Sequence, residues 1–207
     1  MYALTRTGRV ETVNYRTVKL PSDAEIPEFV KEDFAHFYRD LFRHFAASQG
    51  AVAVTEYAWD MGWCDPCASE PLSADELREL GVFWTDAGGG SGGARNMAGG
   101  AAPVFVTRLH VRYDRVSFPE DLAFQVTGDR TNFQGRYIIR HEWKGDDTCA
   151  AAAQYRTSLR ERREKQARTV ADLTGWKLDQ VRGRMAVAED STAPRDNITW
   201  WQRLWKK

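Results

Sequence analysis

The stretch Val52–Cys67 (Val-Ala-Val-Thr-Glu-Tyr-Ala-Trp-Asp-Met-Gly-Trp-Cys-Asp-Pro-Cys) decides how the middle of this chain is built. Its first half, from Val52 to Trp59, has the alternation of a strand. Its second half holds two of the three cysteines, Cys64 and Cys67, in one turn. A helix start at Ser73 follows, so strand, turn and helix succeed one another closely. No established catalytic constellation accompanies the motif.

The composition is that of a folded protein without net charge. The 207 residues contain 29 acidic and 29 basic side chains, so no global field would draw the chain onto nucleic acid or an anionic membrane. We therefore expect no nucleic-acid partner. We also expect neither a signal peptide nor a transmembrane segment, because no apolar run approaches the roughly 20 residues of a spanning helix.

The order of elements predicts an α+β fold with a mostly antiparallel sheet. Strands at 2–5 and 9–20 are expected to form a hairpin around Thr7-Gly8. One long amphipathic helix is predicted from Pro27 to about Ser48, since apolar residues recur there at helical spacing. The members of this apolar stripe are Val30, Phe34, Phe37, Tyr38, Leu41, Phe42 and Phe45.

The second half of the chain predicts more strands and then a helical C-terminal region. Ser73 and Glu76 form a capping-box pattern, and 87–102 reads as a Gly-rich loop. Strands are expected at 105–113, 122–127 and 135–143, the last two paired antiparallel across Gly128-Asp129. A second capping-box pattern at Ser158 and Glu161 predicts a helix to about Leu173, and Gly175 separates it from one more short helix. We expect one domain over 1–186 and a Trp-rich basic tail over 187–207.

Several motifs resemble one bacterial family known only as domain of unknown function 2330. They are Glu56-Tyr57-Ala58-Trp59-Asp60, Trp63-Cys64-Asp65-Pro66-Cys67, Pro71-Leu72-Ser73, Phe105 to Tyr113, Asn132 to Tyr137 and Leu173-Thr174-Gly175-Trp176. The family supplies no activity, cofactor or catalytic residue to transfer. The resemblance does imply an exported bacterial protein, located outside the cytoplasm. It also implies that the chain is the C-terminal part of a larger domain, so that a missing N-terminal half or self-association would cover an open strand edge.

The cysteines allow three interpretations. Redox catalysis is disfavoured, because Pro71 limits the helix after the motif and Asp60, Asp65 and Glu70 raise a thiol pKa. A structural disulfide, within the turn or with Cys149, is the simpler interpretation in an exported protein. A zinc site would take Cys64 and Cys67 with Cys149 and either His110 or His141, but a single Cys-x-x-Cys pair is a weak signal. We therefore expect no cofactor, with zinc as the alternative.

Two basic segments were considered as contact surfaces. The stretch from Arg156 to Arg168 is interrupted by Glu161 and Glu164 and lacks aromatic residues, which favours a solvated helix face. The tail has apolar residues on one helical face, as in helices that contact a membrane surface or dock on a protein, and burial of this face against the protein's own domain is the alternative. These residues are Trp200, Trp201, Leu204 and Trp205.

The sequence thus favours a non-catalytic binding or structural module of an exported bacterial protein. The alternative is a thiol- or zinc-dependent enzyme centred on Cys64 and Cys67.

Overall fold

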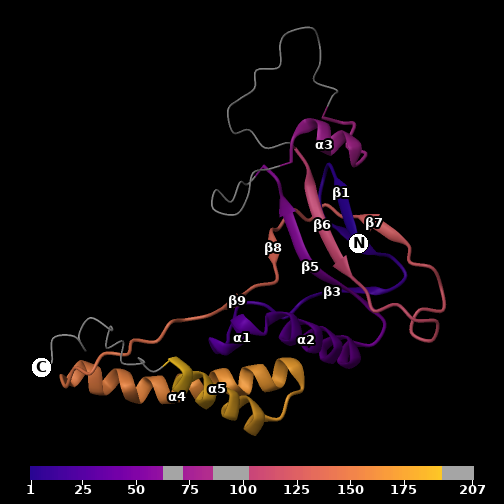
Figure 1. Ribbon diagram of the computed structural model, residues 1–207. Coiled ribbons are helices and arrows are strands. Elements are labelled where there is room, and N and C mark those ends of the chain that lie inside the picture. Colours follow the sequence, from indigo (N-terminus) through magenta and orange to yellow (C-terminus); the bar gives the residue numbers. More distant parts are fainter. Residues whose placement is uncertain (63–71, 86–102, 193–207) are drawn as a thin grey trace, which may run out of the picture. The chain divides into compact units, whose positions relative to one another are not determined.

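The computed structural model describes residues 1–62, 72–85 and 103–192 and confirms the α+β fold (Figure 1). It divides into two compact units. Unit 1 comprises Met1–Asp23 and Phe45–Arg136, and unit 2 comprises Ala24–His44 and the chain from Tyr137 onward. The expectation of one domain over 1–186 stays a prediction.

The described elements alternate between strands and helices. In chain order they are β1 (Tyr2–Thr5), β2 (Val10–Thr12), β3 (Arg16–Lys19), β4 (Ala24–Glu25), α1 (Phe29–Glu32), α2 (Phe34–Gln49), β5 (Val52–Asp60), α3 (Ala74–Glu79), β6 (Phe105–His110), β7 (Phe124–Val126), β8 (Phe133–Gln134), β9 (Tyr137–Ile138), α4 (Ala150–Thr174) and α5 (Leu178–Thr192).

Unit 1 is organised around the long strand β5. The main sheet has the order β1-β6-β5-β3, and β8 also pairs with β5 (Figure 1). All of these pairings are antiparallel except β3 with β5, which run parallel. All five residues of β5 from Val52 to Glu56 are buried. Such a run without alternation is expected of a strand that has neighbours on both edges and is covered on both faces. The sheet is therefore mixed but mostly antiparallel, as the sequence predicts.

The predicted strand pairings were wrong although most of the strands exist. β1 pairs with β6, with Tyr2 opposite Arg108, instead of forming a hairpin with the next strand. β2 pairs with β7, and β4 pairs parallel with β9, so the predicted pairing of 122–127 with 135–143 does not form. The turn at Gly8 instead packs against the backbone of Thr127 and Asp129. The turn signals in the sequence favour pairing between neighbouring strands. The actual partners of β1, β2 and β4 lie about a hundred residues further along the chain.

The helix α3 confirms the predicted capping box. The Ser73 hydroxyl accepts a hydrogen bond from the Glu76 backbone, and the Glu76 carboxylate accepts one from the Ser73 backbone. Leu77 is fully buried and forms a small apolar cluster with Val82 and Val104. Val104 directly precedes β6, and Met61, which follows β5, packs against the cluster and donates its backbone hydrogen bond to Val104. The cluster therefore holds α3 at this end of the β5–β6 pair.

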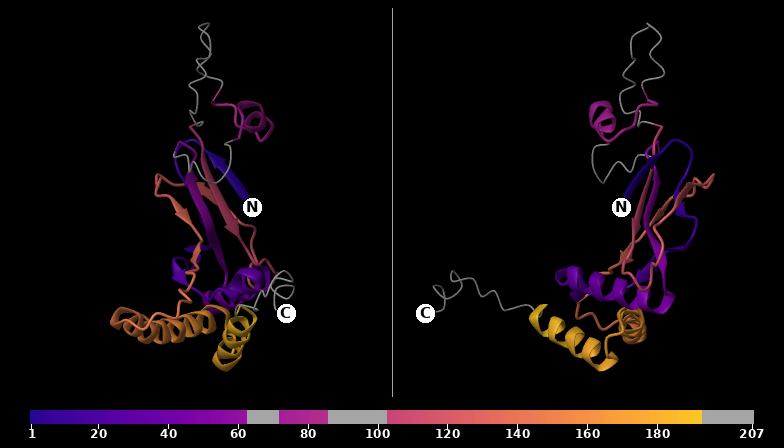
Figure 2. Two further views of the ribbon diagram at one scale, coloured as in Figure 1. Left: turned by 60° about the vertical axis from the view of Figure 1, so that its left-hand side comes forward. Right: turned by 90° about the vertical axis from the view of Figure 1, so that its right-hand side faces the viewer.

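Unit 2 contains the short strands β4 and β9, and its other described elements are helices. The predicted helix at 27–48 is present, but Asp33 divides it into α1 and α2. Its buried face includes Phe37, Leu41 and Phe42, as the apolar stripe predicts. α4 and α5 lie side by side, separated by a short connection at Gly175 (Figure 2). Among the helices of the described ranges, none combines the length and apolar character needed to cross a bilayer.

Gly175 ends α4 as predicted, while the start of that helix was misplaced. Gly175 adopts a left-handed conformation (φ 73°), which glycine reaches without strain. α4 begins at Ala150, so Ser158 lies inside it and its hydroxyl donates to the Tyr155 carbonyl. The pattern of Ser158 and Glu161 was therefore not a helix start, because an interior serine satisfies its hydroxyl on the preceding turn.

Candidate functional site

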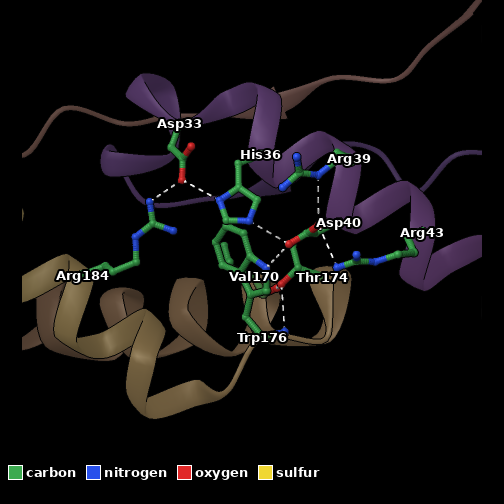
Figure 3. Close-up of polar contacts among 9 residues, drawn as sticks. All are labelled: Asp33, His36, Arg39, Asp40, Arg43, Val170, Thr174, Trp176 and Arg184. Carbon is green, nitrogen blue, oxygen red and sulfur yellow. Dashed lines mark hydrogen bonds and ion pairs between the residues drawn. The ribbon is translucent and has the colours of Figure 1, made fainter.

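Unit 2 contains a cavity of about 890 Å³ formed by α1, the first turns of α2, the α4–α5 connection and α5. Its size falls within the range of small-molecule sites. Figure 3 shows the polar contacts on one side of it. The lining residues are Phe29, Glu32, Asp33, His36, Asp40, Trp176, Gln180, Val181, Gly183, Arg184 and Val187.

Helical spacing places the ionisable side chains of the cavity in one row. His36 follows Asp33, the residue directly before α2, by three residues and precedes Asp40 by four, so the three side chains lie on one side of the helix. The Nδ1 atom of His36 lies 3.2 Å from Asp33 Oδ2, and its Nε2 atom lies 3.0 Å from Asp40 Oδ2 (Figure 3). A doubly protonated ring can donate to both carboxylates, whereas a neutral ring can donate to only one.

Asp40 is the most deeply buried charge of the row, with 4% of its surface exposed. Its Oδ2 accepts a hydrogen bond from Trp176 Nε1 at 2.8 Å, and its Oδ1 accepts one from Arg43 at 2.9 Å. Burial alone would raise the pKa of Asp40, but the Trp176 hydrogen bond and the nearby positive charge of Arg43 outweigh it, so the pKa lies below the ordinary 3.8. Asp40 therefore stays ionised at neutral pH.

Asp33 is held by Arg184 of α5. The Arg184 Nη2 atom donates to Asp33 Oδ2 at 2.6 Å, and this hydrogen bond is the main cause that lowers the pKa of Asp33. The Arg184 guanidinium also lies over two aromatic rings, 4.5 Å from the centre of Phe29 and 5.1 Å from that of Trp176. These contacts are cation–π interactions, and they join α1, α5 and the α4–α5 connection around one charged group.

The geometry at the end of α4 explains the position of Trp176. Gly175 turns the chain, and the Trp176 backbone donates to the Thr174 hydroxyl at 3.2 Å. The Trp176 ring then lies 5.2 Å from the His36 ring and makes an edge contact with Phe37. The indole thus closes one wall of the cavity while its N–H reaches Asp40.

Glu32 is the exception among the charged residues of the cavity. It is exposed at the end of α1 and has no hydrogen-bond or ion-pair partner within the described part of the chain. Asp33 and Asp40, in contrast, each have several donors. The cavity therefore presents one carboxylate whose charge is not compensated.

Unit 1 has a separate polar cluster at a β-bulge. The register between β5 and β6 shifts between Thr55 and Tyr57, so Glu56 is the extra residue of the bulge. Its buried carboxylate lies 2.7 Å from Arg108 Nε and 2.7 Å from His110 Nδ1. Both partners project from β6. His110, a predicted metal-ligand candidate, is thus an ion-pair partner of Glu56 on a partly exposed sheet face.

The residues directly before the cysteines, Tyr57 to Gly62, are held by contacts within unit 1. Trp59 stacks on Tyr57, with ring centres 6.0 Å apart. Asp60, at the end of β5, pairs with Arg130 and accepts a hydrogen bond from the Gly62 backbone at 2.9 Å. The predicted residues Trp63, Cys64, Asp65, Pro66 and Cys67 lie outside the described residues, as do the loop at 87–102 and the tail residues Trp200, Trp201, Leu204 and Trp205.

The remaining candidates belong to unit 2 and do not converge with a third ligand there. Cys149 is an exposed free thiol at the start of α4, so the structure gives no support to a disulfide through it. His141 is exposed and lies 2.9 Å from Glu28. Within the described ranges, no group of three or more His, Cys, Asp or Glu residues could hold a metal ion. The absence of stoichiometric zinc stays a prediction, to be checked by elemental analysis of the whole chain.

Sequence reasoning missed the cavity. Neither His36 nor Asp40 was among the predicted site residues. A signal was present, because Asp40 follows the buried Phe37 by three residues and so lies on the apolar stripe. A charged residue on a buried face needs a partner, and that partner, Trp176, lies 136 residues away.

Comparison with known proteins gives one result. Residues 1–125 match the family model DUF2330, described as an uncharacterized protein conserved in bacteria. This range contains most of unit 1 and the first helices of unit 2, and it ends before the motifs at 132–137 and 173–176. No curated protein and no solved structure is detectably similar to the chain.

Proposed function

Because the chain belongs to the bacterial family DUF2330, whose description names no activity, we propose a function from its own geometry. The chain is a non-catalytic binding module, and the cavity of unit 2 is its ligand site. Its role in an exported protein, outside the cytoplasm, is part of the proposal and rests on the family resemblance alone.

The observation that carries the proposal is the construction of the cavity wall. The Arg184 guanidinium of α5 lies over the Phe29 ring of α1 and the Trp176 ring of the α4–α5 connection, and Asp33 fixes the guanidinium in place. Binding sites of this size combine apolar walls with a few oriented polar groups. Since the polar groups already hold one another, the cavity is pre-organised, and a ligand would bind without first ordering it.

The same contacts argue against catalysis in the cavity. Both ring nitrogens of His36 face carboxylates, so neither is positioned as a general base for a substrate. Asp33 and Asp40 have lowered pKa values and would not act as proton donors near neutral pH. Among the described residues that line the cavity there is no serine, threonine, cysteine, lysine or tyrosine that could act as a nucleophile.

Gly183 provides a direct test. It lines the cavity, and a Cβ atom added there would meet no atom within 4 Å. A Gly183→Phe variant should therefore obstruct the part of the cavity beside α5 without a clash at Cβ, and Gly183→Ala is the matched control because it makes the same glycine replacement with far less added volume. Both replacements also remove a helix glycine, which should not destabilise α5.

The assay is protein-observed NMR of the ¹⁵N-labelled full chain titrated with a library of small aromatic and aliphatic compounds. We expect saturable shifts for residues of α1, α2 and α5, retained in Gly183→Ala and lost in Gly183→Phe. Shifts that persist in Gly183→Phe, or no binding to the wild-type chain at millimolar concentrations, would contradict the proposal.

A further inference from the structure

We propose that the ligand is an organic cation, with an apolar body and a single ammonium group that pairs with Glu32. This inference deepens the proposed function and rests on it, since it concerns the same cavity. It assigns a role to Glu32, the charged lining residue that the contacts of the cavity leave uncompensated.

The charge balance of the cavity favours a cation. Three carboxylates line it, from Glu32, Asp33 and Asp40, against one guanidinium, from Arg184. Arg184 is committed to Asp33, and Arg43 from outside the lining compensates Asp40. The ring of His36 lies between Asp33 and Asp40 and makes no ion pair with Glu32, so a positive charge on His36 would not compensate the Glu32 carboxylate directly. A positive group beside Glu32 would gain an ion pair without breaking an existing one.

The apolar wall favours a ligand with a hydrophobic body. Val187 is 69% exposed at the cavity although it is a large apolar residue, and Phe29 lies on the neighbouring helix α1. Covering such side chains removes apolar surface from water, which contributes about 25 cal/mol per Å².

An anionic ligand fits these observations less well. A carboxylate would approach Glu32 with the same sign of charge, and the charge of Arg184, the guanidinium of the lining, is already compensated by Asp33. The arrangement therefore selects for cations by both attraction and repulsion.

The test uses three probes with the same apolar body: 4-phenylbutylammonium, 4-phenylbutanol and 4-phenylbutyrate. Their binding to the full chain is measured by isothermal titration calorimetry at low ionic strength. The key variant is Glu32→Gln. The matched control is Glu161→Gln, because Glu161 is exposed in the same unit, does not line the cavity and has no partner within the described residues. Gly183→Phe reports whether binding depends on the cavity.

We expect the ammonium probe to bind most tightly and the carboxylate least. In Glu32→Gln the affinity for the ammonium probe should fall about 1.5- to 5-fold, the range of an exposed ion pair, and added salt should reduce the difference. The affinity for 4-phenylbutanol should be unchanged, and Glu161→Gln should behave as the wild type.

Two results would overturn the inference, and they differ in what they leave standing. If the alcohol or the carboxylate binds as tightly as the ammonium and Gly183→Phe abolishes that binding, the cation preference is wrong and the binding module stands. If no probe shows binding that depends on Gly183, the inference fails together with the assignment of the cavity as the ligand site.

Discussion

Replacing Asp40 with asparagine tests whether the buried carboxylate holds unit 2 together. Asp40 lies on α2, and its strongest buried contact is the 2.8 Å hydrogen bond from Trp176 at the α4–α5 connection. Asparagine keeps the size and one acceptor oxygen but removes the charge. The variant therefore changes electrostatics and hydrogen bonding while the packing is preserved.

The expected loss in the free energy of unfolding is about 1–4 kcal/mol. Weakening a buried hydrogen bond to a charged group costs about 0.5–2 kcal/mol, since a charged bond contributes roughly 1.5–3 kcal/mol and a neutral one about 1 kcal/mol. The contacts with Arg43 and His36 add less, about 0.2–1 kcal/mol each, because water screens these partly exposed side chains. In a chain of this length the loss corresponds to a fall in Tm of about 2–16 °C.

The assay is urea unfolding of the full chain followed by far-UV circular dichroism, with Arg43→Met as the control. Arg43 is 61% exposed, so its loss should cost under about 1 kcal/mol. A double-mutant cycle with Trp176→Phe should give a coupling energy of about 1 kcal/mol for the Asp40–Trp176 pair. If Asp40→Asn costs no more than Arg43→Met, or if the coupling energy is zero, the reasoning is refuted.

Three further predictions follow from other contacts. Because the pKa values of Asp33 and Asp40 are lowered, their contribution to stability is present above pH 4 and should be lost as pH falls through the folded-state pKa values, which acid titration of the unfolding free energy measures. Glu56→Gln should cost about 1–3 kcal/mol in chemical denaturation, since it removes a buried charge with two partners at the β-bulge. Gly175→Ala should cost about 1–2 kcal/mol, because φ is 73° and the new Cβ would lie 2.8 Å from the His44 ring.

Each of these predictions has a control. An Asp33→Asn variant should lose less stability than the wild type on acidification, and an equal loss would show that other groups dominate. Glu79→Gln, at an exposed residue without a partner in the described chain, should leave stability unchanged where Glu56→Gln lowers it. His44→Ala should recover only part of the cost of Gly175→Ala, and full recovery would mean that the backbone conformation contributes nothing.

The parts of the fold that depend on neighbouring residues could be predicted from the sequence. The amphipathic helix, the capping box at Ser73 and the helix end at Gly175 all follow from contacts within one or two turns. Strand partners could not be predicted, because β1 pairs with β6 across about a hundred residues. The local turn signals at Thr7-Gly8 and Gly128-Asp129 favoured nearer partners, and packing of the sheet overrode them.

The cavity of unit 2 could not be predicted from the sequence for the same reason. The candidate residues predicted from the sequence centre on Cys64 and Cys67, which lie outside the described residues, so their role stays a prediction. The cavity joins residues 29–40 to residues 176–187, which come together only when α5 packs on α1. Even the break at Asp33, which brings Glu32 and Asp33 to the cavity, interrupts a stripe that otherwise predicts one continuous helix.

A crystal structure of the full chain grown with 4-phenylbutylammonium tests the central claim most directly. The account predicts density for the probe in the cavity of unit 2, with the phenyl group against Phe29 and Val187 and the ammonium nitrogen within about 4 Å of the Glu32 carboxylate, the limit for an ion pair. An empty cavity at a probe concentration that saturates binding in solution, or a probe bound elsewhere on the chain, would contradict the account.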